Sequence, residues 1–175
     1  MTKWALLAIV LVAAVFAAAA LAGLALPQSH VATRTAHVAA PPEQVWATLT
    51  DVAAHPSWRR GLTRVEMLPA VEGRTSWREH EGSSRVSYEA VEAVPPRRLV
   101  TRITDRNLPF GGRWEFDVRP AAGGSDVTIT EHGEVYNPIF RLISRHVIGH
   151  TATIDAYLGA LQRRHASGGA REPTP

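Results

Sequence analysis

The sequence predicts an α+β fold in which one curved antiparallel sheet wraps around a long C-terminal helix. Three observations lead to this prediction: an apolar N-terminal segment, a succession of strand-like segments joined by short turns, and an amphipathic helix at the end of the chain. A sheet with one apolar face needs a cover, and the final helix is the only other element long enough to supply it. We therefore expect that helix to lie across the sheet.

The composition is that of one folded domain with an appendage. The 175 residues are 45% hydrophobic and 20% charged, which is unlike a disordered chain. Lys3 is the only lysine, and the 19 basic residues form no basic cluster against the 16 acidic ones. We therefore expect no nucleic-acid partner. The absence of cysteine is compatible with an oxidising compartment and with the cytosol alike.

The N-terminal segment from Trp4 to Leu26 has no charged side chain. As a helix it would be about 34 Å long, enough to cross a hydrocarbon layer of about 30 Å. The alternative is a cleaved signal peptide, with Lys3 as its basic region and Ala20-Leu21-Ala22 as its cleavage site. The apolar run is longer than a signal core, which favours an anchor. Positive charge flanks the span at Lys3 and the amino terminus on one side and at Arg34 on the other. This balance favours a single-pass protein with its N-terminus inside and its domain outside the cytoplasm.

Three regions follow from these patterns: a membrane anchor or signal peptide at 1–27, a folded domain at 28–165, and a disordered tail at 166–175. The domain begins with an alternating strand at 30–39, and Pro41-Pro42 ends it. A helix is predicted from Pro42 to the stop at His55-Pro56, with a short second helix carrying Trp58. Further strands are predicted at 63–69, 74–81, 84–94, 98–106, 112–119 and 126–135.

The last predicted element is an amphipathic helix from Pro138 to about His165. Its apolar residues recur at helical spacing, with Asn137 as its cap. They are Phe140, Ile143, Val147, Ile154, Leu158 and Leu161.

Three segments of the domain carry a family resemblance: "AAPPEQVWATLTDVAAHPSW" (39–58), "VEAVPPRRLVTRI" (91–103) and "VTITEHGEVYNPIFRLISRHVIGH" (127–150). Together they resemble the START-like (SRPBCC) superfamily, which includes proteins of the polyketide cyclase/dehydrase type and the coenzyme Q-binding type. The segment at 127–150 resembles the pattern of membrane-anchored bacterial members. The resemblance implies a helix-grip fold with a cavity between sheet and helix. It does not imply one chemistry, because such a fold serves carriers, enzymes and interaction modules.

The candidate cavity wall follows from strand phase. Trp114 and Phe116 share one face of their strand, and Trp77 and Tyr88 fall in the apolar phases of theirs. Ordinary core packing explains these aromatic residues equally well. A cavity becomes the better interpretation only if polar groups meet on the same face.

Glu131 is such a polar group, because it interrupts the apolar row formed by Val127, Ile129 and Val135. Burial would raise the pKa of this carboxyl unless a partner offsets it. His150 on the covering helix, Arg102 and Arg78 are the candidate partners. In the alternative, a bulge at Gly133 turns Glu131 to solvent.

The "HVIGH" segment places His146 and His150 four residues apart on the final helix, a spacing that metals use. The glutamate of the metalloprotease motif is missing, and we predict no metal site. No phosphate-binding glycine loop or dinucleotide motif occurs, so no cofactor is expected.

We predict a monomeric protein that binds a hydrophobic small molecule or lipid and contacts the membrane through residues 4–26. One alternative is a cyclase or dehydratase with Glu131 and His150 as an acid/base pair. The other is an interaction module with a vestigial cavity. The predicted ligand-binding residues are Trp77, Tyr88, Trp114, Phe116, Glu131, His150 and Ile154.

Overall fold

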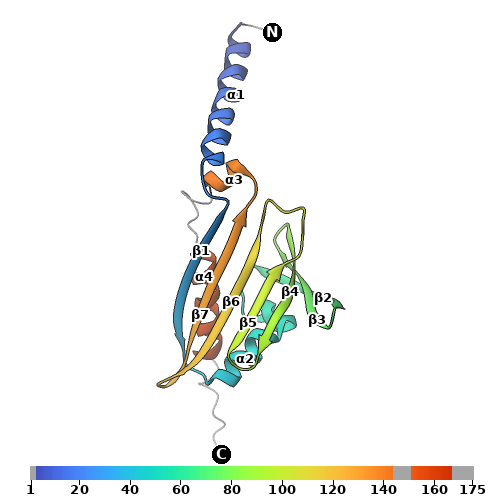
Figure 1. Cartoon of the computed structure of the whole chain (residues 1–175), viewed down its shortest axis with the longest axis vertical. Helices are drawn as coiled ribbons and strands as arrows, with labels where there is room; N and C mark the ends of the chain where they lie inside the picture. Colours follow the sequence, from blue (N-terminus) through green and yellow to red (C-terminus); the bar gives the residue numbers. More distant parts are fainter. Residues whose placement is uncertain (1–2, 144–150, 167–175) are drawn as a thin grey trace, which may run out of the picture.

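The computed structural model describes residues 3–143 and 151–166. One curved antiparallel sheet carries helices on one side, and an N-terminal helix projects from one end (Figure 1). The predicted fold class is thereby confirmed. The elements are α1 (Lys3–Leu24), β1 (Ser29–Val38), α2 (Pro42–Thr50), the 3-10 helix η1 (Val52–Ser57), β2 (Leu62–Val71), β3 (Arg74–Glu81), β4 (Ser84–Val94), β5 (Arg98–Ile103), β6 (Phe110–Ala121), β7 (Gly124–Val135), α3 (Pro138–Ile143) and α4 (Ala152–Ala166).

The strand order is β1-β7-β6-β5-β4-β3-β2, and every neighbouring pair is antiparallel. Strands β2 to β7 form the predicted meander, because short turns connect each strand to the next. The first strand pairs with the last, so β1 and β2 are the two edges of an open sheet. Pairing of β1 with β7 brings residues 29–38 beside residues 125–134.

The core lies between the sheet and α4. On α4, Ile154 and Leu161 are fully buried, and they share one hydrophobic cluster with Val127 and Ile129 of β7. Their spacing on the helix and alternation on the strand are those that the sequence indicated. Apolar burial on this one face is the main stabilising contribution to the fold.

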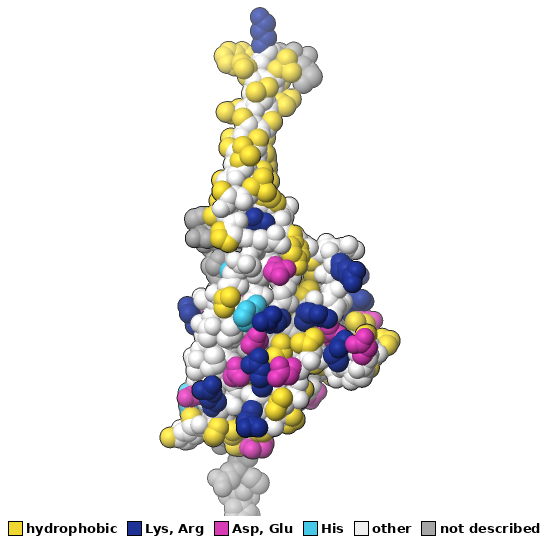
Figure 2. Space-filling model, viewed as in Figure 1, with side chains coloured by type: hydrophobic (Ala, Val, Ile, Leu, Met, Phe, Trp, Pro, Cys, Tyr) yellow, Lys and Arg dark blue, Asp and Glu magenta, His cyan; other side chains and the backbone are white. Residues whose placement is uncertain are grey.

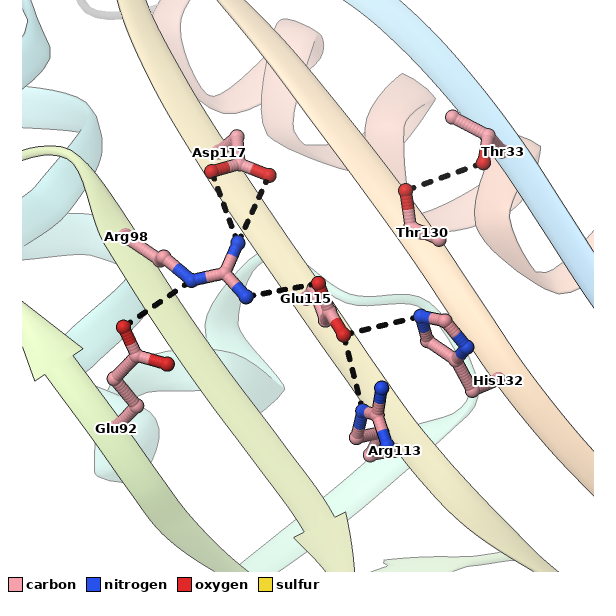
Figure 3. Close-up of polar contacts among 8 residues, drawn as sticks. All are labelled: Thr33, Glu92, Arg98, Arg113, Glu115, Asp117, Thr130 and His132. Carbon is pink, nitrogen blue, oxygen red and sulfur yellow. Dashed lines mark hydrogen bonds and ion pairs between the residues drawn. The ribbon is translucent and has the colours of Figure 1, made fainter.

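The other face of the sheet carries charge (Figures 2 and 3). The Arg98 guanidinium donates to Glu92 at 3.2 Å, to Glu115 at 2.9 Å and to Asp117 at 3.2 Å. His132 Nε2 lies 3.0 Å from the other carboxylate oxygen of Glu115. These side chains alternate with the buried row of their strands, so the sheet has one polar face and one apolar face.

The segment after β1 differs from the prediction in detail. Helix α2 begins at Pro42 as expected but ends at Thr50, and η1 then buries Val52 and His55. Pro56 lies inside η1, and Trp58 follows it. A 3-10 turn changes the direction of the chain sooner than a continuous α-helix would, which brings the His55 side chain to the interior.

The structure describes two parts of the helix predicted between Pro138 and His165. Helix α3 contacts α1, whereas α4 packs on β1 and β7. The Asn137 side chain accepts a hydrogen bond from the Phe140 amide at 3.0 Å, as the predicted helix cap requires. His146, His150 and the predicted tail from residue 167 onward lie outside the described residues.

Two valine substitutions test which face of the sheet carries the stability. Val127 is fully buried on β7, and Val31 on β1 is 65% exposed. We expect Val127→Ala to lower the free energy of unfolding by about 2–3 kcal/mol through lost methyl burial and a residual void. Val31→Ala should change it by less than about 0.5 kcal/mol. Equal losses in urea unfolding would contradict this assignment of faces.

Candidate functional site

A cavity of about 390 Å³ lies between the apolar face of the sheet and the helices. Its wall includes five of the predicted ligand-binding residues: Trp77, Tyr88, Trp114, Phe116 and Glu131. Among the described residues of that prediction, Ile154 is the exception, because it is fully buried in the core cluster beside the cavity. The seventh predicted residue, His150, is not among the described residues.

Aromatic rings form much of the cavity wall. Trp77 of β3 and Tyr88 of β4 are register partners and stack with their centroids 5.7 Å apart. Trp114 and Phe116 of β6 lie 5.7 Å and 5.5 Å from the Tyr157 ring of α4. The sequence analysis missed Tyr157, although it follows Ile154 by three residues and therefore shares its helix face. It joins the sheet wall to the helix wall.

Glu131 lies on the apolar face, as its position in the row of β7 indicated. Its side chain is 21% exposed, and its Oε1 lies 3.7 Å from Nε2 of His30 on β1. Burial raises the pKa of Glu131 above its ordinary value, and a hydrogen bond from Trp114 opposes that rise only in part. The carboxyl is therefore easier to protonate than one in water.

The alternative, a bulge at Gly133, does not occur, because β7 keeps continuous register with both of its neighbours. Gly133 instead makes room for His30. A Cβ atom at residue 133 would lie 2.2 Å from Cε1 of the His30 ring, closer than any contact allows. The glycine in the inward row thus lets the imidazole approach Glu131.

The described neighbour of Glu131 is His30, whereas the candidate partners were His150, which lies outside the described residues, and the two arginines Arg102 and Arg78. Arg102 binds Glu89, and Arg78 donates to Ser87 at 3.1 Å, both with side chains in the opposite strand phase. His30 was missed because its position depends on pairing between the first and last strands. The register of β1 on β7 places residue 30 opposite residue 133, and the alternation within either strand alone does not reveal that pairing.

A second polar cluster lies on the cavity wall near α2 and η1. Arg59 donates to Glu79 Oε1 at 2.6 Å, and the Trp77 indole N–H donates to the same oxygen at 3.3 Å. His55 Nδ1 lies 3.7 Å from that oxygen. Burial alone would raise the pKa of Glu79, but these donors and the Arg59 charge lower it to about 2. Glu79 is therefore ionised and paired.

The position of His55 is fixed by its second nitrogen. The Leu49 carbonyl lies 3.2 Å from Nε2, so Nε2 donates its hydrogen there. Nδ1 then faces Arg59 Nη1 at 3.3 Å. The Arg59 guanidinium also lies over the Tyr157 ring, 5.0 Å from its centroid, in a cation–π contact. The cluster thus joins η1, β3 and α4.

The two carboxylates give the cavity two different polar regions. Glu79 is held as an anion by the Arg59 guanidinium and the Trp77 indole, whereas Glu131 has one indole donor and the His30 imidazole at 3.7 Å. Within residues 3–143 and 151–166, no group of three potential metal-ligating side chains converges. The arrangement is suited to holding a hydrophobic molecule and forming hydrogen bonds with a polar part of it.

Similarity to known proteins agrees with the fold and the cavity, which together define a helix-grip protein. Residues 29–166 match the model of the family described as polyketide cyclase / dehydrase and lipid transport. The chain belongs to this family, so the predicted START-like superfamily is confirmed. No curated protein shows significant sequence similarity to the chain.

Solved structures share the fold at low identity. A START superfamily protein from Mycobacterium smegmatis has a TM-score of 0.64 at 18% identity, over 79% of this chain and 98% of its own. The Zhui aromatase/cyclase from Streptomyces sp. R1128 has a TM-score of 0.59 at 17% identity, over 82% and 99%. The di-domain ARO/CYC StfQ from the steffimycin pathway has a TM-score of 0.66 at 12% identity, over 82% of this chain. The chain spans 53% of StfQ, so it corresponds to about half of that protein.

The lowered pKa of Glu79 predicts acid sensitivity. Its pKa falls from 4.5 to about 2 on folding, which corresponds to roughly 3 kcal/mol of stability at neutral pH. That contribution is complete above pH 4.5 and is lost as the pH falls toward 2. Glu79→Gln should therefore be less stable than the parent at pH 7, and the difference should shrink between pH 4.5 and 2 in urea unfolding.

Glu131→Gln is the matched control, because its raised pKa has the opposite sign. The folded state loses stability as the pH rises through the pKa of Glu131, and glutamine removes that loss. Glu131→Gln should therefore gain stability relative to the parent as the pH rises from 4 to 7. The same direction of change for both variants would contradict the two environments described.

Proposed function

We propose that the protein is a membrane-tethered binder or carrier of a hydrophobic small molecule or lipid. The ligand would lie between the sheet and α4, and the observation that carries the proposal is the cavity of about 390 Å³ with its aromatic wall. A solid core of the same fold would have filled this space with side chains. A monomer suffices for this function, because one chain encloses the cavity.

Apolar burial would supply most of the binding energy. A ligand that buries about 200 Å² of apolar surface gains roughly 5 kcal/mol at about 25 cal/mol per Å². Trp77, Tyr88 and Trp114 offer flat apolar surfaces on the cavity wall. Ring systems and acyl chains are both suited to such a wall.

The polar groups favour a ligand whose head is neutral. Burial already makes the charged form of Glu131 unfavourable, so an anionic head beside it would add repulsion. Glu79 and Arg59 neutralise each other, so this pair offers no free cation to a phosphate. A carbonyl or hydroxyl oxygen bound by Glu131 or by the Trp114 indole fits these groups best.

The tether is α1. Its 22 residues make it the one helix among the described residues that is long and apolar enough to cross a membrane. Its apolar side chains are exposed along its length (Figure 2). Such a surface is unfavourable in water and favourable in lipid, which supports insertion. Lys3 at the start of the helix, against Arg34 beyond its end, favours a domain outside the cytoplasm. A tether would hold the cavity where a lipid-soluble ligand is concentrated.

An enzyme of the cyclase or dehydratase type is the second candidate. It is favoured by the easily protonated Glu131 carboxyl on the cavity wall, beside His30 and Trp114. The solved structures of similar fold include aromatase/cyclases. An interaction module with a vestigial cavity has less support, because the space between sheet and helix is open.

Blocking the cavity tests the proposed function. Val86 lies on the cavity wall near the start of β4. Val86→Trp should fill part of the cavity with little change in melting temperature. We expect the full-length parent protein, extracted from membranes and analysed by native mass spectrometry, to carry a hydrophobic compound that Val86→Trp lacks.

Val31→Trp on the exposed face of β1 is the matched control, and it should retain the compound. A parent protein that carries no compound and binds no neutral hydrophobic dye would contradict the proposal. Retention of the compound by Val86→Trp would place the ligand elsewhere.

A further inference from the structure

The cavity opens at the end of the sheet that carries α1. Four exposed residues of its wall lie at strand ends: Glu81 at the end of β3, Ser84 at the start of β4, Arg113 near the start of β6 and Glu134 near the end of β7. Antiparallel pairing brings these ends together, and β7 leads there into α3 beside α1 (Figure 1). We call this end the mouth.

The opposite end of the cavity is closed. Leu49 of α2 and Leu99 of β5 line it, and each is at most 5% exposed. A ligand therefore enters and leaves past the strand ends nearest α1.

A buried arginine fixes α1 to this end of the domain. Arg141 of α3 is only 9% exposed. Its guanidinium donates to the carbonyls of Gly23 at 3.1 Å and Leu26 at 2.9 Å, at the C-terminus of α1. It also donates to the Val135 carbonyl at 3.1 Å, where β7 ends. The Arg141 side chain thus hydrogen-bonds to backbone carbonyls at the end of α1 and at the end of β7, and so connects the two.

Backbone contacts also hold the end of α1 against α3 and β7. Gly23 lies so close to α3 that a Cβ atom there would stand 1.9 Å from the Pro138 carbonyl oxygen. The Val135 amide donates to the Gln28 carbonyl at 2.8 Å, which holds the segment between α1 and β1 against β7. The link between anchor and domain is therefore short, bonded and packed, unlike a flexible linker.

The surface around the mouth is suited to a lipid interface. Phe110 and Phe140 lie with their rings 6.4 Å apart, and Ile143 of α3 is 42% exposed. Arg85 at the start of β4 and Arg106 in the loop before β6 are exposed at the same end. Apolar side chains with nearby arginines match acyl chains and phosphate headgroups respectively.

We propose that Arg141 locks α1 to the domain so that the mouth of the cavity lies against the bilayer surface. The ligand then passes directly between lipid and cavity without crossing water. This inference rests on the proposed membrane tether. It adds two points: the mouth contacts a lipid bilayer, and Arg141 is the residue that positions it there. A loosely tethered domain would rotate freely and would not keep the mouth at the bilayer.

The absence of cysteine from the chain permits a direct test with single fluorescent labels. Asn107→Cys places a label in the exposed loop at the mouth, and Ala122→Cys places one in the exposed turn between β6 and β7 at the far end. The full chain is reconstituted in phosphatidylcholine vesicles that contain a nitroxide-labelled phospholipid. Quenching at residue 107 should be severalfold stronger than at residue 122.

Arg141→Gln tests the lock, because it removes the charge and most of the donors. Quenching at residue 107 should fall toward the value at residue 122, while the domain keeps its circular dichroism spectrum. A second variant with a short Gly/Ser segment inserted between Pro27 and Gln28 leaves Arg141 unchanged. It should show the same loss, and it applies even if Arg141→Gln fails to fold.

Each other result overturns a defined part of the inference. Equal quenching at residues 107 and 122 in the parent protein would overturn the contact of the mouth with the bilayer. Unchanged quenching in the Gly/Ser variant, or in a folded Arg141→Gln protein, would overturn the lock. Failure of the full chain to float with the vesicles would overturn the proposed tether itself, and that result is distinct from the other two.

Discussion

The packing of α4 across only part of the sheet determines the rest of the structure. The helix contacts β1 and β7 through Ile154, Leu158 and Leu161, which form a dry core with Val127 and Ile129. At the other edge of the sheet, η1 packs on β2. Helix α2 packs on β6 and β7, and the cavity lies between these helices and the apolar face of the strands. The partial cover of the sheet by α4, α2 and η1 therefore leaves the space that forms the site.

The same arrangement gives two glutamates opposite properties. Glu79 lies beside η1, where Arg59 and Trp77 donate directly to it, and its pKa falls to about 2. Glu131 lies on the wall formed by β7, where burial raises its pKa more than the Trp114 hydrogen bond lowers it. Both residues are glutamates, so the difference in their pKa comes from their surroundings, and only Glu79 is held in its charged form. The cavity therefore combines a neutralised ion pair with one carboxyl that changes protonation easily.

Local patterns in the sequence were sufficient for the elements and for much of the cavity wall. Strand alternation placed Trp77, Tyr88, Trp114 and Glu131 on the inward face, where the structure has them. Such a prediction needs no knowledge of neighbouring strands, because successive side chains of a strand point to opposite faces of the sheet. The long-range partners were not predictable in this way. His30 meets Glu131 only because β1 pairs with β7, and that pairing is not visible in either segment alone.

The second polar cluster was missed for a related reason. Glu79 is in the inward phase of β3, but Arg59 reaches it from the turn after η1, where no periodic pattern operates. The helix at the end of the chain was predicted from its apolar spacing, and α4 buries Ile154 and Leu161 as that spacing indicated. The sequence pattern carries no signal for α3 packing against α1. That contact depends on the end of β7 lying beside the end of α1.

Xenon binding in crystals of the protein tests most directly whether the space between α4 and the strands is open. Xenon enters apolar cavities that side chains leave empty. We expect a xenon atom in the cavity within contact distance of Trp114 and Tyr157, with those side chains unmoved. Crystals with no xenon between the sheet and α4, and with side chains filling that space, would contradict it.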